Sequence, residues 1–283
     1  MARYRRLEII RRLDPVEDHW EIYRLSASFE FPWDYRKALE FALFRTYAVP
    51  SISALLDKTR EFARRPQRRY DDTLLLMGAL TEHGYDSAPG RAALRRINQM
   101  HGRYAIGNED MLYVLSTFVY EPIRWLGKYG WRAPHEHERL AAFHFYREVG
   151  SRMGIKDIPA GYREFEAFNR DYEREHFHYR DSNQRVGTAT VDLFCSWYPA
   201  IGRPAVRRAV YAAMDEPLLR AFGFPRQPAW LERAVERGLA GRGRLVRHLP
   251  VRRYSRSARD PGNRTYPGYP EGYRITDLGV PPQ

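Results

Sequence analysis

The sequence has few of the residues that build covalently linked or thiolate-bound scaffolds. Of its 283 residues, Cys195 is the single cysteine, which excludes internal disulfides and thiolate metal clusters. Four residues are lysine, so arginine carries nearly all of the positive charge behind the net +12. There is no zinc-finger spacing, no RNA-recognition aromatic block and no helix-turn-helix pattern. We therefore expect no nucleic-acid partner.

Long apolar runs are also missing. No stretch approaches the ~20 apolar residues of a membrane span, and the arginine-rich start does not read as a signal peptide. We therefore expect a cytoplasmic protein. Its basic ends, 3–12 and 242–259, could make peripheral contact with an anionic membrane, although a solvated charge cluster is the default interpretation. Dinucleotide, nucleotide triphosphate and zinc-protease motifs are absent, as is any sustained strand alternation.

Helical periodicity and aromatic residues are plentiful. Hydrophobic residues make up 43%, with 20 Tyr, 14 Phe and 6 Trp, which is enough for a large core and for a cavity that holds an apolar ligand. The patterns predict one all-α domain over residues 1–240 and an irregular basic segment over 241–283. A helix from Asn108, as N-cap, should be buried and central, and Pro122 should kink or end it near Tyr120. The last helix should end near Leu239, because Gly238, Gly241 and Gly243 are closely spaced around this position.

Two neighbouring helical patterns turn polar residues toward the core. The first inward stripe consists of Arg69, Thr73, Met77 and Leu80. The second consists of Leu94, Ile97, His101 and Tyr104. A histidine on such a stripe is usually a hydrogen-bonded core residue, but a buried arginine beside it needs an anionic partner. Either Asp71 and Asp72 supply that partner, or a cofactor with carboxylates does, and haem carries two as well as an iron that takes one imidazole.

Three blocks of this region resemble a known family. They are R-R-Y-D-D-T, then I-N-Q-M-H-G-R-Y-A-I-G-N-E-D-M-L-Y-V-L-S-T-F-V, then P-I-R-W-L-G-K-Y-G-W-R. Together they resemble the MpaB-type oxygenases, which include the bacterial rubber oxygenases (latex-clearing proteins) and a fungal oxygenase that shortens the prenyl chain of a mycophenolic acid precursor. The resemblance is closest over 31–199. It implies a globin-reminiscent helical bundle around one buried haem b.

The resemblance also implies roles for particular residues. His101 stands at the position of the proximal iron ligand, and Arg69 and Thr73 match the family's arginine-x-x-x-threonine pair near the haem. Arg103 is a further candidate partner for a haem propionate. The implied reaction uses dioxygen as co-substrate and an apolar small molecule, either an isoprenoid or another compound that contains an alkene. Two rival functions remain open: a haem-binding protein without oxygenase activity, and a cofactor-free helical interaction protein.

The chain also departs from the family pattern. A lysine that can occupy the distal iron site in rubber oxygenases is replaced by Asp72. The glutamate proposed there as a base falls near Ser53, where no acid stands, and Glu61 is the nearest glutamate.

Other histidines and Cys195 are assigned structural roles. Glu173-x-x-His176 has di-iron spacing, but no second copy exists, so we expect a structural histidine there. We expect His144 in the core or lining a cavity. Cys195 should lie on the polar edge of its helix and be dispensable for the cofactor.

Overall fold

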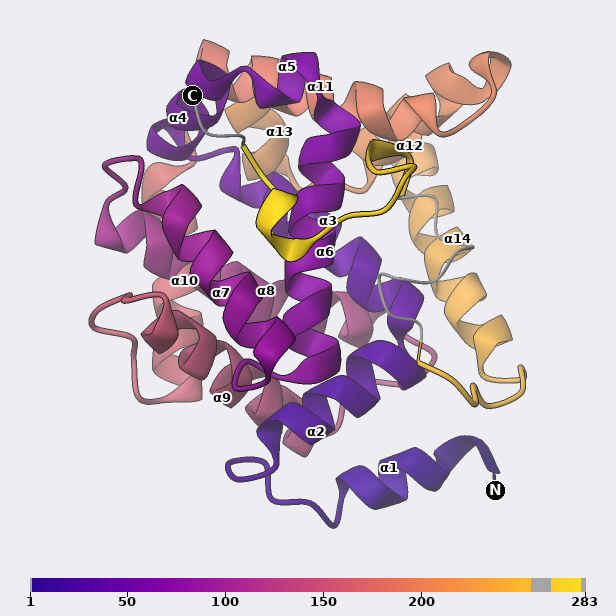
Figure 1. Cartoon of the computed structure of the whole chain (residues 1–283). Coiled ribbons are helices and arrows are strands. Elements are labelled where there is room, and N and C mark those ends of the chain that lie inside the picture. Colours follow the sequence, from indigo (N-terminus) through magenta and orange to yellow (C-terminus); the bar gives the residue numbers. More distant parts are fainter. Residues whose placement is uncertain (1, 256–265, 281–283) are drawn as a thin grey trace.

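A computed structural model describes residues 2–255 and 266–280, and these residues form helices and turns without any strand (Figure 1). The predicted all-α architecture is confirmed. The helices beyond those discussed below are α1 (Arg5–Ile10), α2 (His19–Arg24), α4 (Pro50–Thr59), α5 (Glu61–Arg64), α12 (Arg203–Ala212) and α13 (Glu216–Phe222). A π-helical segment, Leu25–Glu30, continues α2.

The predicted central helix is α8 (Asn108–Tyr129). It packs against α3 (Pro32–Thr46), α9 (Glu136–Arg152) and α10 (Tyr162–His176), and residues 115–122 are all buried. Pro122 does not end the helix, which continues to Tyr129. The missing N–H removes one backbone hydrogen bond, but packing on several sides holds this stretch in helical form.

The start of α8 also differs from the prediction. Gly107, not Asn108, occupies the N-cap position. The Asn108 side chain instead bridges to the backbone of Lys156, donating to its carbonyl at 3.1 Å and accepting from its N–H at 2.9 Å. The amide therefore ties the helix start to the loop after α9.

The two helices that carry the candidate residues pack against each other. They are α6 (Pro66–His83), which begins with proline at its first turn, and α7 (Ala88–His101). The Ser87 hydroxyl caps α7 by accepting a hydrogen bond from the Gly90 N–H. Because α7 ends at His101, Tyr104 lies beyond the helix and the predicted stripe stops one member short.

A second hydrophobic cluster joins the end of α3 to α11 (Asp181–Ser196), α12 and α13. Cys195 belongs to this cluster and is 2% exposed. Its predicted place on a polar edge is therefore wrong, because α11 is covered by α12 and α13 on that side.

The last helix, α14 (Ala229–Val246), runs seven residues past the predicted end at Leu239 and so crosses the predicted domain boundary at 240. Gly243 explains the error. A Cβ at this position would come within 2.3 Å of the Tyr129 carbonyl oxygen, at the end of α8. This glycine therefore permits close helix approach and does not terminate the helix.

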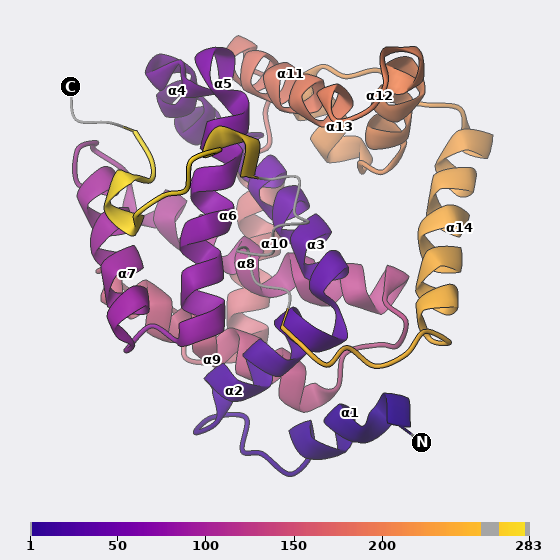
Figure 2. The ribbon, with the colours of Figure 1, turned by 45° about the vertical axis from the view of Figure 1, so that its right-hand side comes forward.

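The C-terminal segment 266–280 crosses α6 and α7 (Figures 1 and 2). Two 3₁₀ turns, Tyr266–Gly268 and Ile275–Asp277, interrupt otherwise irregular backbone. Tyr269 and Leu278 are buried, and the Leu278 carbonyl accepts a hydrogen bond of 2.6 Å from Arg96 on α7. The predicted irregular segment is thus packed against the two helices of interest.

Among the described residues, no single helix has the length and apolar composition needed to cross a membrane.

Candidate functional site

His101 lies at the C-terminal end of α7 with its ring largely buried. The Nδ1 atom is buried and has no hydrogen-bond partner. The Nε2 atom forms no hydrogen bond with any described residue either, but it is partly accessible to solvent. Burial, followed by the positive charge of Arg69, lowers the pKa of His101 from 6.5 to about 4. The imidazole is therefore neutral at physiological pH, and no described residue accepts a hydrogen bond from its Nδ1 atom.

Arg69 and Thr73 are joined directly. They lie one turn apart on α6, and the Arg69 guanidinium donates a hydrogen bond to the Thr73 hydroxyl oxygen. The guanidinium also lies 5.6 Å from the centre of the Phe62 ring, on α5. The hydroxyl and the ring thus hold the cation from two sides.

The electrostatics place these residues in one neighbourhood. The charge of Arg69 acts on His101 and also on Tyr47, which follows α3. Burial raises the pKa of Tyr47 to about 12, and the nearby guanidinium opposes this shift. The Tyr47 and Phe62 rings are in edge contact at 5.0 Å. The site is therefore built where α3, α5, α6 and α7 meet.

The two acids next to Arg69 in sequence are engaged elsewhere. Asp71 accepts hydrogen bonds from Gln67 at 2.9 Å and from the Gly268 N–H at 2.9 Å. Asp72 accepts from the Tyr269 hydroxyl. Among the described residues, no acid forms an ion pair with Arg69. Arg69 is therefore not paired with Asp71 or Asp72, which was the simpler of the two explanations for its position.

Arg103 stands apart from this group. It is exposed, two residues beyond α7, and its guanidinium donates to the Val280 carbonyl at 3.1 Å. Its contact is thus with the C-terminal segment, and a role toward a propionate stays a prediction.

The positions considered for a catalytic base have structural partners. Ser53 is fully buried and hydrogen-bonded to Ser182 at 2.7 Å and to Asn183. Glu61 is buried beside Phe62 and accepts a hydrogen bond of 2.7 Å from Arg65. Glu61 is thus next to Phe62, the ring that contacts Arg69, and its place in the sequence did not indicate this. The carboxylate of Glu61, however, is bound by Arg65.

The alternative histidines serve the packing. His176 ends α10, stacks on Tyr172 at 4.0 Å between ring centroids, and its Nδ1 contacts the Tyr172 carbonyl, as a structural histidine would. Glu173 pairs with Arg45 instead of a metal. Half-buried His144 lies 6.4 Å from the His19 ring. Within residues 2–255 and 266–280, no three His, Cys, Asp or Glu side chains gather as metal ligands would.

Comparison with known proteins agrees with the region identified from the sequence. Residues 40–248 match the family described as ER-bound oxygenase mpaB/B'/Rubber oxygenase, catalytic domain. The chain belongs to this family. The match extends well beyond residue 199, where the resemblance seen in the sequence weakened, and it takes in α12, α13 and α14.

Three relatives of the mpaB-type family are fungal. The ER-bound oxygenase mpaB of Penicillium roqueforti (strain FM164) is 27% identical over 224 residues, covering 73% of this chain and 75% of the relative. The mpaB' protein of Penicillium brevicompactum is 27% identical over 76% of this chain, and mpaB of the same organism is 29% identical over 65%. The chain covers 55% and 52% of these two relatives, respectively. By its family, the chain is an oxygenase and so an oxidoreductase enzyme.

One neighbour of this candidate site was missed in the sequence. Tyr269 joins the C-terminal segment to Asp72, directly before Thr73, and its ring lies 4.6 Å from the guanidinium of Arg68, directly before Arg69. No local pattern could find this contact, because 197 positions separate Tyr269 from Asp72. The tyrosine-rich composition of the segment was the available signal.

Proposed function

We propose that this chain is a haem b-dependent oxygenase that acts on an apolar, isoprenoid or other alkene-containing substrate. One observation carries the proposal. His101 on α7 is a neutral imidazole whose Nδ1 atom has no hydrogen-bond partner, and Arg69 on α6, which acts on it electrostatically, has no acidic partner among the described residues. Both residues stand at the positions that the family resemblance assigns to the haem. The family match supports the oxygenase class.

The residues present fit a haem. An iron ligand must offer a neutral ring nitrogen, and His101 has one that no described residue occupies. Leaving a buried ring nitrogen without a partner costs about 1–3 kcal/mol, so a structural histidine would be expected to have one. Arg69 offers the positive charge that a propionate requires.

Each residue then has a definite task. His101 would hold the iron, and haem when bound would supply the activation of dioxygen. Arg69 would neutralise a propionate or donate a hydrogen bond to a molecule bound at the haem. Thr73 orients Arg69 by accepting its hydrogen bond. The Phe62 and Tyr47 rings, which are buried beside Arg69, make the surroundings of the guanidinium apolar.

An absorption spectrum and a turnover assay distinguish the oxygenase from its two rivals, a haem-binding protein without oxygenase activity and a cofactor-free interaction protein. The purified protein, supplemented with haem, should show a Soret band; a colourless protein would support a cofactor-free interaction role. Dioxygen consumption should then rise with squalene, a linear isoprenoid alkene, and not with squalane, its saturated counterpart. Haem binding without uptake on any alkene would indicate a haem protein that is not an oxygenase.

The iron ligand is tested by substitution. His101→Ala should lose most of the haem while circular dichroism shows that the helices persist. His144→Ala is the matched control, since this histidine is also half-buried on a neighbouring helix, and it should keep its haem. Full haem content in His101→Ala would contradict the assignment and make His144 or His176 the next candidate.

A further inference from the structure

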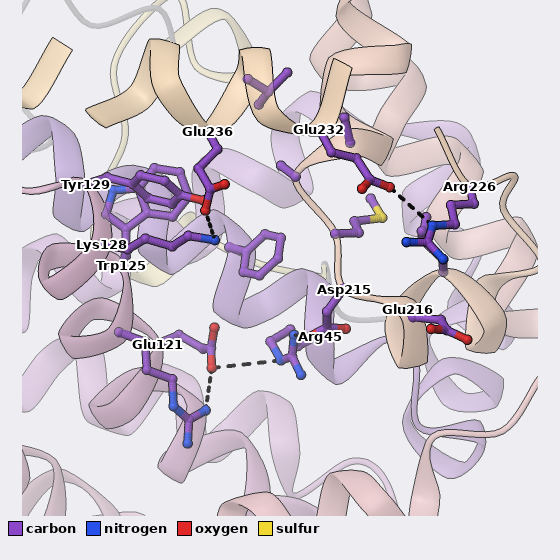
Figure 3. A pocket seen from close by; sticks show the side chains of 17 residues that line it. Arg45, Glu121, Trp125, Lys128, Tyr129, Asp215, Glu216, Arg226, Glu232 and Glu236 are labelled. Atoms are coloured by element: carbon purple, nitrogen blue, oxygen red, sulfur yellow. Dashed lines mark hydrogen bonds and ion pairs between the residues drawn. The ribbon is translucent and has the colours of Figure 1, made fainter. Parts of the chain in front are cut away.

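A pocket of about 560 Å³ is lined by residues of α3, α8, α12, α13 and α14 (Figure 3). The helices α12, α13 and α14 lie on the side of the molecule away from α7 (Figure 2). The pocket does not include His101, Arg69 or Thr73. Nine of its lining residues are charged, so it is not the aromatic, apolar cavity expected beside a haem.

The charges of this pocket differ from those of the chain as a whole. Five acidic and four basic residues line it, a net charge of −1 in a chain of net charge +12. The basic residues already have acidic partners: Lys128 pairs with Glu236 at 2.6 Å, and Arg226 with Glu232 at 3.4 Å. Arg45 donates from all three of its nitrogens, two to Glu173 and one to Asp215. Arg124 pairs with Glu121 at 2.6 Å; its Nη2 atom makes no hydrogen bond, but it is buried and lies 3.6 Å from Glu166. An anionic ligand would therefore have to displace an existing ion pair or expose this buried nitrogen.

Glu121 offers the pocket an open acceptor. Its side chain is 7% exposed, and its Oε1 atom accepts a hydrogen bond from Arg124 at 2.6 Å and lies 3.8 Å from Arg45. Its Oε2 atom accepts no hydrogen bond from any described residue, yet it is not sealed from solvent. Figure 3 shows this second oxygen turned away from the two guanidinium groups, toward the space of the pocket. With 7% of the side chain exposed, this oxygen has little access to water and can accept a hydrogen bond from a ligand in the pocket.

An aromatic wall stands beside this acceptor. The Trp125 ring contacts Tyr129 at 4.9 Å and Phe41 at 6.4 Å between centroids. Lys128 lies over the Tyr129 ring and Arg45 over Phe41, but no cation of the described residues lies over Trp125. Tryptophan is the side chain whose face attracts cations most strongly.

We propose that this pocket binds a small organic ammonium cation with an aromatic or other apolar body. The ammonium group donates to Glu121 Oε2, and the apolar body lies against Trp125 and Tyr129. The excess of acids around the mouth favours a cation over a neutral or anionic molecule of the same shape. This site is separate from the proposed haem site and does not depend on it.

Three probes of one size test the proposal by isothermal titration calorimetry at neutral pH and low salt: benzylammonium, benzyl alcohol and benzoate. Benzylammonium should bind at least tenfold more tightly than the other two. Glu121→Gln should weaken benzylammonium binding at least tenfold, because the amide keeps an acceptor for Arg124 but loses the charge. Glu164→Gln, an exposed position on α10 outside the pocket, should leave the Kd unchanged.

A second variant keeps the ion pairs intact. Val235→Trp fills the pocket from α14 and should abolish binding, even if Glu121→Gln lowers stability. The Soret band, recorded during the same titration, shows whether any benzylamine reaches a haem iron instead. Equal affinity for benzoate, no binding of benzylammonium, or an unchanged Kd in Val235→Trp would overturn the proposal.

Discussion

Arg69 and Thr73 contribute differently to the site, although one hydrogen bond joins them. Arg69 carries the charge, and its influence reaches His101 and Tyr47. Thr73 carries none and acts on Arg69, whose guanidinium has in addition the Phe62 ring to hold it. Loss of the hydroxyl should therefore loosen the guanidinium without removing it.

The first prediction follows from this difference. Arg69→Ala should reduce haem occupancy modestly and Thr73→Ala hardly at all, because both leave the ligand at His101 in place. Turnover on an alkene should fall in both, by about tenfold or more for Arg69→Ala, since a charge-assisted hydrogen bond is worth roughly 1.5–3 kcal/mol. Occupancy is read from the Soret absorbance per protein. Arg64→Ala, exposed on α5, is the control. Wild-type turnover in Arg69→Ala would exclude it from the reaction.

The second prediction concerns the pH dependence of the haem-free protein. The pKa of His101 is lowered from 6.5 to about 4, so its neutral form stabilises the fold above about pH 6.5. This stability is lost as the pH falls toward 4, because the unfolded chain then binds the proton more readily. Between about pH 7.5 and 5, the loss should be about 2 kcal/mol.

Urea denaturation at both pH values measures this loss. His101→Gln should lose less stability than the wild type over the same range, and the exposed control His83→Gln should follow the wild type. Parallel curves for the wild type and His101→Gln would mean that the ring is more hydrated than the structure shows.

The sequence was informative about these residues for a definite reason. Residues three and four apart share a helical face, so the inner stripes of Arg69, Thr73 and His101 follow from spacing within single helices. In the structure all three are half-buried, whereas Asp71 and Asp72, which the stripe did not include, are buried. The partners of these residues do not follow from spacing, because the contact of Asp72 with Tyr269 depends on how a distant segment folds back.

Among the elements, α14 shows that two glycines in the same helix can have opposite effects on its stability. Glycine lowers helix propensity, and three of them near residue 240 predicted a helix end. In the structure, Gly243 faces the end of α8 with no room for a Cβ, whereas a Cβ at Gly241 would meet nothing within 4 Å. The sequence shows where the glycines are, but it does not show that the backbone of α8 lies against Gly243.

These two glycines give the third prediction, with a matched control in the same helix. Gly241→Ala should raise the free energy of unfolding by up to about 1 kcal/mol, through helix propensity alone. Gly243→Ala should lower it by roughly 1–3 kcal/mol, because the added methyl group forces α14 away from the Tyr129 carbonyl. Urea denaturation of both variants decides this. A stabilising Gly243→Ala would mean that the contact between α14 and α8 is loose.

At the scale of the whole molecule, one buried charge cluster joins segments far apart in the sequence. Arg45, at the end of α3, pairs with Glu173 on α10 and with Asp215 at the start of α13, and Glu121 of α8 lies 3.8 Å away. Burial opposes the charge of Arg45, but the hydrogen bonds that it donates to Glu173 and the nearby carboxylates raise the pKa of Arg45 well above its usual value. Tyr113 donates to Glu173 at 3.0 Å and completes the cluster.

The fourth prediction is that this cluster holds the helices together far more than a surface ion pair does. Arg45→Ala leaves the carboxylate of Glu173 without its cation and Glu121 with Arg124 alone, which should cost about 3–5 kcal/mol of unfolding free energy. In a chain of this size, that corresponds to a fall in Tm on the order of 10 °C. Arg207→Ala breaks an exposed pair with Asp192 and should cost within about 1 kcal/mol. Differential scanning calorimetry of both variants measures the contrast. Equal losses would mean that water reaches Arg45 through the adjoining pocket and screens the cluster, which would also weaken the case for a buried acceptor at Glu121.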